Sequence, residues 1–174
     1  MTARKPLNPG WYACRTRARA EKQVNRMLRL RGIEPYLPLV DQVKHWADRK
    51  KRVAFPLFPG YVFAHFGPGM FHQVLRTPGV VTVVGTAGSP VPVRADELDS
   101  IRLLVEFVNA GNPAPQTVEF VEIGQEVVVA EGPFSGMRGV LTEERGHARV
   151  IIRLSVLRKA VSIEVPREML RAAS

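Results

Sequence analysis

The segment from Gly124 to Val140, GQEVVVAEGPFSGMRGV, constrains the fold more than any other part of the chain. A β-rich run leads into a Gly-Pro pair, and Gly136 and Gly139 follow soon after Phe134. Glycine permits positive φ and close approach of two backbones, and an aromatic ring can plug a small core. The pattern is typical of a tight corner in a small β-barrel.

The last third of the chain contains four short β-rich runs separated by glycine-containing turns. A regular succession of short strands at about ten-residue spacing favours an all-β barrel over a layered α/β domain. We therefore predict an SH3-like barrel with strands at Glu126–Ala130, Arg138–Thr142, Ala148–Leu154 and Ala160–Val165.

The preceding part of the chain alternates strand and helix patterns in the order β-α-β-β-α-β-α. Such alternation predicts a sheet with helices packed on it, of the ferredoxin-like α+β class. We expect strands at Trp11–Thr16, Pro35–Val43, Gly60–Phe66 and Val80–Val84, with helices at Ala18–Arg31, Gly69–Arg76 and Asp96–Val108.

A linker separates the two parts. Asn109–Gln116, NAGNPAPQ, has no periodicity and contains one glycine and two prolines, which is typical of a semi-extended connection. The predicted organisation is one domain over 1–108, a linker over 109–118 and a second domain over 119–174.

The positive charge of the chain is concentrated in its first third. The whole chain has a net charge of +9, whereas residues 1–52 alone, with 14 Lys/Arg and 4 Asp/Glu, carry +10. A concentrated positive field attracts phosphate backbones. Asp48–Arg52 is predicted to be a charged hairpin tip, and such tips are often charged merely for solubility.

Several functional classes are excluded by what the sequence lacks. There is no phosphate-binding glycine loop, and the four histidines lack metal-ligand spacing, so we expect neither catalysis nor a metal or other cofactor. The single cysteine, Cys14, fits a reducing compartment. No apolar run approaches the roughly 20 residues that span a bilayer, and no signal peptide is evident, so a cytoplasmic protein without membrane contact is expected.

The segment Phe55–Phe66, FPLFPGYVFAHF, ends in a strand that is apolar on both faces. Alternation places Tyr61 and Phe63 on one face and Val62 and Phe66 on the other. One face can form the core, and the other must be covered by the chain's own helices or by a partner. A central strand buried on both sides is the simpler reading.

Together these segments resemble the NusG family of transcription elongation factors. WYACRTRARAEKQVNRML, FPLFPGYVF, LRTPGVVTVVG, SPVPV and GQEVVVAEGPFSGMRGV occur in the order and spacing of that family. The resemblance implies an NGN domain, a ferredoxin-like α/β sandwich, followed by a KOW domain, an SH3-like barrel.

The resemblance also implies a binding activity. NusG-family NGN domains dock an apolar surface onto the clamp helices of the RNA polymerase largest subunit, beside the upstream DNA fork, and suppress pausing. By this resemblance Phe58, Tyr61 and Phe63 would belong to or support the docking pocket. A monomer associated with the bacterial nucleoid through RNA polymerase is the expected state.

Basic residues near the first predicted helix are candidates for contact with the displaced non-template DNA strand. An ordinary solvated helix face explains the same pattern equally well. The candidates are Arg15, Arg17, Arg19, Lys22 and Arg26.

The KOW domain of the family recruits a second partner, Rho or the small-subunit ribosomal protein that is also NusE. Phe134 matches the aromatic residue of that surface, and Met137 and Leu157 are assigned to it. Where NusG commonly has an IFGR-like turn, this chain reads Val156-Leu157-Arg158-Lys159. That departure leaves the choice of partner open.

The segment RLSVLRKAVSIEV is similar to specialised paralogues of the UpxY/RfaH kind, and the basic first third of the chain suits such a paralogue. A specialised antiterminator is therefore expected, and two alternatives stay open. One is a housekeeping NusG. The other is an RNA-binding or ribosome-associated KOW protein without polymerase contact. The FPGY strand argues against it, because KOW ribosomal proteins lack an NGN domain. The β-branched runs of the last domain argue against an RfaH-like helical refolding of the barrel.

Overall fold

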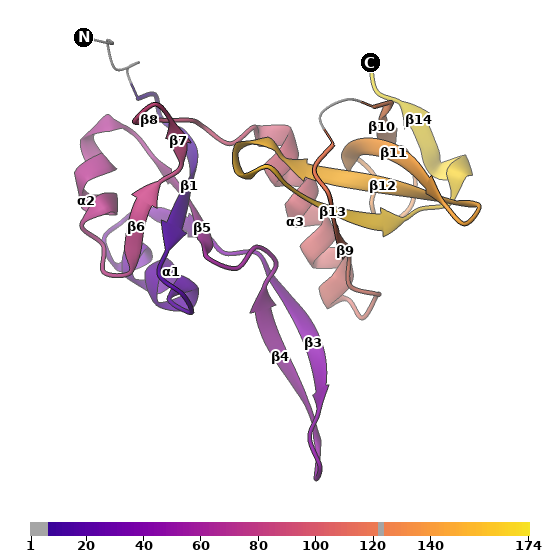
Figure 1. Cartoon of the computed structure of the whole chain (residues 1–174), viewed down its shortest axis with the longest axis horizontal. Coiled ribbons are helices and arrows are strands. Elements are labelled where there is room, and N and C mark those ends of the chain that lie inside the picture. The colour runs from indigo at the N-terminus through magenta and orange to yellow at the C-terminus, as the bar shows by residue number, and fades with distance from the viewer. Residues whose placement is uncertain (1–6, 122–123) are drawn as a thin grey trace. The chain divides into compact units, whose positions relative to one another are not determined.

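A computed structural model describes residues 7–121 and 124–174 of the chain (Figure 1). Packing divides the chain into two compact units. The first comprises the described part of Met1–Leu39 together with Phe55–Arg94, and the second comprises Val40–Ala54 and Ala95–Ser174.

The first unit is built on a four-stranded antiparallel sheet with strand order β2-β5-β1-β6. In order along the chain, this is the βαββαβ arrangement of ferredoxin-like folds, which confirms the predicted fold class. Its elements are β1 (Gly10–Thr16), α1 (Glu21–Leu30), β2 (Glu34–Tyr36), β5 (Tyr61–Phe66), the 3₁₀ turn η1 (Pro68–Met70), α2 (Phe71–Leu75) and β6 (Val80–Val83).

Both helices cover the same face of this sheet. Val24 and Leu28 of α1 and Val74 of α2 are fully buried in one cluster with Cys14 of β1 and Val62 of β5. The apolar stripe of α1 therefore has the spacing that a helix needs to bury one face. The predicted alternation of β5 is also confirmed, since Val62 belongs to this cluster whereas its neighbour Phe63 does not.

The ends of the elements differ somewhat from the sequence prediction. Helix α1 is shorter than the predicted 18–31 and is followed by Gly32 at φ +73°, the left-handed conformation that commonly ends helices. The segment predicted as one extended strand over Pro35–Val43 is divided. Its first part is edge strand β2, where a proline is tolerated, and its second part leaves this sheet.

That second part forms a separate two-stranded hairpin of β3 (Leu39–His45) and β4 (Lys50–Pro56). The predicted tip at Asp48–Arg52 was placed too late, because the turn occupies residues 46–49 and Lys50 already begins β4. Composition alone misplaced the tip, because charged residues also occur within strands when both faces of a hairpin are exposed to solvent. A second small hairpin, β7 (Gly85–Thr86) with β8 (Ser89–Pro90), also follows β6.

The second unit contains α3 (Ala95–Asn109) and a six-stranded sheet of order β14-β10-β11-β12-β13-β9. The four predicted barrel strands are confirmed, and two short strands are added. The strands are β9 (Gln116–Val118), β10 (Glu126–Val129), β11 (Arg138–Glu144), β12 (His147–Leu154), β13 (Lys159–Glu164) and β14 (Leu170–Ala172), with 3₁₀ turns η2 (Ser155–Leu157) and η3 (Arg167–Met169).

The glycines of the GPFSGMRG segment serve two different purposes. Gly132 and Gly136 have φ of +82° and +92°, so each occupies a conformation that L-residues avoid. Gly139 has ordinary φ, but a Cβ there would collide with the carbonyl group of Ile151 and the side chain of Val150. The predicted positive φ and close backbone approach are therefore both present, at different positions.

Helix α3 packs on the barrel within this unit. The backbone N–H of Ser155 donates to Glu97 Oε2 at 3.0 Å, and the N–H of Arg138 donates to Ser100 Oγ at 3.0 Å. The division into domains at 108 and 119 stays a prediction of the sequence. In the described part of the chain, no helix has both the length and the apolar character required to cross a bilayer.

Candidate partner-binding and nucleic-acid interfaces

A groove of about 410 Å³ lies on the first unit, and we call it the Tyr61 groove. Tyr61 of β5 and Arg15 of β1 contribute to it, and they are directly opposed in the antiparallel register. Its apolar wall comes from Phe71 and Leu75 of α2, one helical turn apart, from Val83 and Val84 at the end of β6, and from Pro90 of β8. The groove thus combines an apolar wall with one arginine.

Tyr61 is held in place by the turn that precedes it. Gly60 has φ +87°, and its N–H donates to Glu21 Oε1 at 2.8 Å. Its carbonyl oxygen accepts a hydrogen bond of 2.8 Å from the N–H of Thr16. The start of β5 is therefore tied both to helix α1 and to the end of β1, which fixes where the half-buried Tyr61 side chain leaves the sheet.

The other two residues assigned to polymerase docking do not line this groove. Phe63 is fully buried and Phe58 is 4% exposed. Phe63 shares its sheet face with Tyr61 and lies 6.3 Å from the Tyr36 ring, centroid to centroid. Of the three residues, Tyr61 alone lines the groove. The docking role of Tyr61 and the supporting role of Phe58 and Phe63 stay predictions.

The five basic candidates are all exposed, but they do not form one compact patch. Lys22 and Arg26 lie one turn apart on α1, whereas Arg17 and Arg19 belong to the loop before it. Arg15 is separate from these, because it lines the Tyr61 groove. The structure therefore brings one predicted nucleic-acid residue together with the predicted docking residue.

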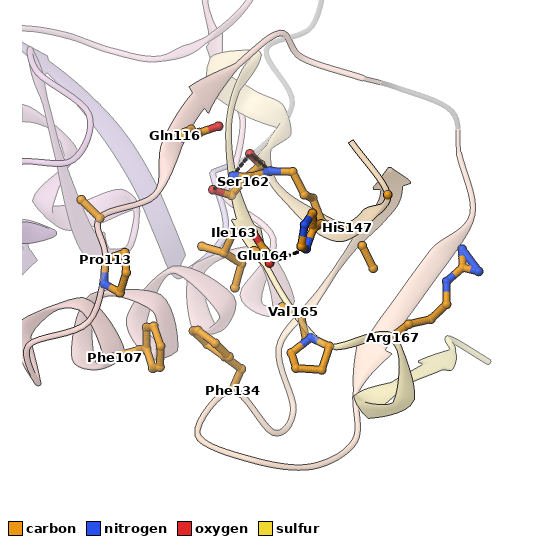
Figure 2. A pocket seen from close by; sticks show the side chains of 15 residues that line it. Phe107, Pro113, Gln116, Phe134, His147, Ser162, Ile163, Glu164, Val165 and Arg167 are labelled. Carbon is orange, nitrogen blue, oxygen red and sulfur yellow. Dashed lines mark hydrogen bonds and ion pairs between the residues drawn. The ribbon is translucent and has the colours of Figure 1, made fainter. Parts of the chain in front are cut away.

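A larger pocket of about 720 Å³ lies on the second unit, and we call it the Phe134 pocket. Figure 2 shows the rings of Phe107, from α3, and Phe134 facing each other, and their centroids are 3.8 Å apart. The opposite wall carries the pair His147 Nδ1–Glu164 Oε1 at 2.9 Å. Phe134 is 5% exposed, so the ring presents little free surface beside its partner Phe107.

The other two residues assigned to the second partner have different environments. Met137 is fully buried, and its carbonyl oxygen accepts a 2.9 Å hydrogen bond from the N–H of Val129. Leu157, in η2, is half-buried and accessible. Neither lines the Phe134 pocket. A direct partner contact is thus compatible with Leu157 and needs rearrangement for Met137.

Burial perturbs two ionisable groups of the first unit. Burial raises the pKa of the Cys14 thiol to about 12, which makes it a weak nucleophile. Burial likewise raises the pKa of Tyr12, against the opposing effect of its 2.7 Å hydrogen bond to the Asn8 carbonyl. Among the residues that the structure describes, no three His, Cys, Asp or Glu side chains are grouped for a metal ion.

Comparison with known proteins places the chain in a family. The family model described as "Transcription termination factor nusG" matches residues 9–102, more than half of the chain. The chain belongs to the NusG family.

Individual NusG proteins match along most of their length. The chain is 32% identical to the "Transcription termination/antitermination protein NusG" of Pseudomonas aeruginosa over 160 residues, covering 84% of this chain and 88% of that protein. It is 30% identical to the protein of the same name from Deinococcus radiodurans, and the match covers 89% of this chain and 94% of that protein. A solved structure, "Domain interaction in Thermotoga maritima NusG", has a TM-score of 0.48 and is 23% identical in sequence. The match covers 96% of this chain and 98% of that chain.

Several residues of the two candidate sites are not indicated by the sequence. Phe71 and Leu75 have i, i+4 spacing, which predicts that they share one helix face. The position of that face beside Tyr61 depends on the order of the strands in the sheet. Phe107 falls within the predicted helix Asp96–Val108, and nothing in its spacing indicates the ring of Phe134. The sequence pattern does not indicate Glu21 either, because its burial, which creates the need for a donor, is visible only in the structure.

Proposed function

We propose that this NusG-family protein is a transcription elongation and antitermination factor that binds the clamp helices of RNA polymerase and suppresses pausing or termination. The observation that carries the proposal is the Tyr61 groove on a chain of this family. Its apolar wall from α2 and its half-buried tyrosine form a concave surface next to the FPGY segment.

The chemistry of the groove suits a helical partner. A pair of helices can lay side chains into an aromatic-lined groove, and tyrosine and arginine are enriched among residues that dominate binding energy. Tyr61 supplies the aromatic contact and Arg15 supplies a cation at the same site. A carboxylate on the partner helix would pair with that guanidinium.

Two further contacts belong to the same proposal. The exposed cations Arg17, Arg19, Lys22 and Arg26 would neutralise phosphates of non-template DNA near the upstream fork. The barrel would recruit a second protein, Rho or the NusE ribosomal protein, through the surface near Phe134 and Leu157. The close contact of Phe107 with Phe134 means that this partner must bind beside or displace Phe107.

We further propose an operon-specialised role rather than a housekeeping one. Support comes from the Val156–Lys159 departure and from the basic first third of the chain. A gene position beside a biosynthetic cluster would favour specialisation, whereas a position beside translocation and ribosomal genes would favour a housekeeping NusG.

A pull-down with core RNA polymerase tests the docking proposal. Tyr61→Asp should reduce retention strongly, because it places a carboxylate in the groove. Val81→Asp is the matched control, since Val81 is 54% exposed on β6 and does not line the groove, and it should bind like the unsubstituted protein. Arg49→Ala should also have little effect. Equal losses in all three variants would reject the groove as the docking site.

A salt titration tests the DNA contact separately. The double variant Lys22→Ala with Arg26→Ala should lower the slope of log affinity against log salt for the assembled elongation complex, by about one unit for each lost phosphate contact. An unchanged slope would identify this helix face as merely solvated. The ribosome-associated alternative predicts no retention on polymerase and retention on ribosomes.

A further inference from the structure

An uncovered stretch of sheet edge lies in the Phe134 pocket. Strand β9 covers the edge of β13 only as far as the pair Ser162↔Gln116. Continuing that register would place Ala114 opposite Glu164, but Ala114 stands between two prolines. Proline fixes φ at about −65°, away from the values of a strand. The edge of β13 is therefore open beyond Ser162, where Glu164 lines the pocket.

The outward-facing backbone groups of this open edge belong to Glu164. The N–H of Val165 donates to the carbonyl oxygen of Ala148 on the β12 side at 3.1 Å. Successive residues of an antiparallel strand turn their backbone groups to alternate sides, so Ile163 also faces β12, whereas Ser162 and Glu164 face away from it. Ser162 is paired there with β9, but the N–H and carbonyl oxygen of Glu164 have no backbone partner among the described residues.

Apolar surface flanks the open edge. Figure 2 shows Pro113, Ile163 and the rings of Phe107 and Phe134 around the same side of the pocket. Side chains alternate along a strand, so a segment added beside β13 would direct every second side chain towards the Ile163 face. The residues between would face the side of the sheet that carries Arg149, the cross-strand partner of Glu164.

The charges that line the pocket are already matched by opposite charges. The ion pairs are His147–Glu164 at 2.9 Å, Arg149–Glu144 at 3.6 Å and Arg167–Glu143. A charged ligand would have to break one of these pairs or remain without a counter-charge, and both cost free energy. The pocket therefore favours an uncharged ligand.

One polar group of the pocket keeps a donor to spare. The Arg149 side chain is 12% exposed, and its Nε and Nη2 donate three hydrogen bonds of 3.0–3.3 Å to Ser162. Its remaining nitrogen, Nη1, donates no hydrogen bond to another described residue. A hydroxyl or carbonyl oxygen of a ligand can accept from this pre-oriented group.

We propose that the open edge of β13 binds an extended, uncharged segment of another protein by strand addition. The segment pairs with the N–H and carbonyl oxygen of Glu164. It packs large apolar side chains against Phe134 and Phe107 and places a small polar side chain beside Arg149. In this mode of recognition, backbone hydrogen bonds provide affinity and pockets for alternate side chains provide specificity.

Other occupants fit this edge less well. A second copy of the chain, paired edge to edge, would bring two Glu164 carboxylates opposite each other. A nucleic acid would find no unmatched cation in the pocket. The inference goes beyond the proposed function, because the edge requires neither the Tyr61 groove nor Leu157, and shares only Phe134 with the residues assigned to Rho or NusE.

An NMR titration of the full chain with the blocked peptide acetyl-TFTFT-amide tests the inference. Paired antiparallel to β13, the central threonine lies opposite Glu164 and both phenylalanines face Phe134. The N–H of Glu164 should exchange rapidly with solvent in the free chain and become protected when the peptide binds. The N–H of Ile163, which already faces β12, should be protected in both states. The peptide acetyl-TATAT-amide should bind more weakly, because it lacks the aromatic side chains.

Modified peptides test the backbone contact without altering the protein. N-methylation of the central threonine removes the donor to Glu164 and should weaken binding at least about threefold, within the usual net effect of one hydrogen bond. N-methylation of a phenylalanine is the matched control, because its N–H faces away from β13, and it should change binding little.

A pair of protein variants tests the same hydrogen bond from the other side. Glu164→Pro removes the outward N–H and leaves the pairing with β12, since proline is tolerated where the N–H faces away from the neighbouring strand. Glu164→Ala removes the same carboxylate and keeps the N–H, so it is the matched control. The proline variant should bind at least about threefold more weakly than the alanine variant. Leu157→Ala should bind like the unsubstituted chain.

Each result decides the question. Protection of the Glu164 N–H, a loss confined to the threonine-methylated peptide and weaker binding by Glu164→Pro than by Glu164→Ala support the inference. It is overturned by a lack of saturable binding, by equal effects of the two methylations, or by equal binding of acetyl-TATAT-amide. A dimer that protects Glu164 without peptide would assign the edge to a second copy and overturn it as well. Because no polymerase is present, these outcomes are independent of the docking experiment.

Discussion

The carboxylate of Glu21, at the start of α1, accepts a 2.8 Å hydrogen bond from the backbone N–H of Gly60, 39 residues further along the chain. Glu21 is 7% exposed, so this bond is shielded from water. It connects the first helix with the turn that places Tyr61 at the groove. The same carboxylate therefore contributes both to folding and to presentation of the candidate docking residue.

Glu21→Ala should destabilise the first unit by about 1–3 kcal/mol, because the N–H of Gly60 loses its acceptor. Glu21→Gln retains an acceptor oxygen and should cost less. Chemical unfolding followed by Trp11 fluorescence, in a Trp46→Phe background, measures the change. Equal losses for the two variants would show that the carboxylate charge, rather than the hydrogen bond, stabilises the turn.

Gly60→Ala should destabilise the same unit by about 1–2 kcal/mol, the cost of a left-handed residue with a Cβ. The substituent itself has room, since no atom lies within 4 Å of it. Gly69→Ala is the control, because that glycine has equal space and no positive φ. A loss of stability in Gly69→Ala as large as that in Gly60→Ala would contradict a backbone origin.

Gly139→Ala should destabilise the barrel by about 1–3 kcal/mol or more through overpacking. The new methyl group would meet the backbone of Ile151 on the neighbouring strand, which cannot move aside as a flexible side chain can. Gly136→Ala should cost less, because its nearest neighbour, Leu103, lies 4.0 Å away and only backbone strain remains. Amide hydrogen exchange in β11 and β12 reports the difference.

Stability should fall at high pH because of Cys14. Its folded pKa of about 12 exceeds the ordinary value of 9.0, so the unfolded chain releases a proton first as the pH rises. The contribution is therefore complete below pH 9 and is lost between about 9 and about 12, with a maximum slope of about 1.4 kcal/mol per pH unit. Unfolding measured across this range should show a shallower decline for Cys14→Ala than for the unsubstituted protein.

The helices and strands could be predicted because the sequence patterns that indicate them are local. The stripe of Val24 and Leu28 indicated a helix, the alternation around Val62 indicated a strand, and Gly32 marked a helix end. Each signal depends on residues within one or two turns of each other. The barrel strands followed in the same way from β-branched runs between glycine turns.

The sites were less predictable because they depend on residues distant in sequence. The Tyr61 groove joins β1, β5, α2 and the β7–β8 hairpin, whose proximity follows from strand order. Neither the Glu21–Gly60 hydrogen bond nor the Phe107–Phe134 contact produces a periodic pattern in the sequence. The three residues assigned together to the docking pocket also differ in burial. Tyr61 is accessible, whereas Phe58 and Phe63 are buried.

The burial of Cys14 has a practical consequence for labelling. It is the chain's one cysteine, and it is enclosed within the first unit and resists ionisation. A cysteine introduced at an exposed position would then react selectively with maleimide reagents. Spectroscopic dyes can therefore be attached site by site without first removing the native thiol.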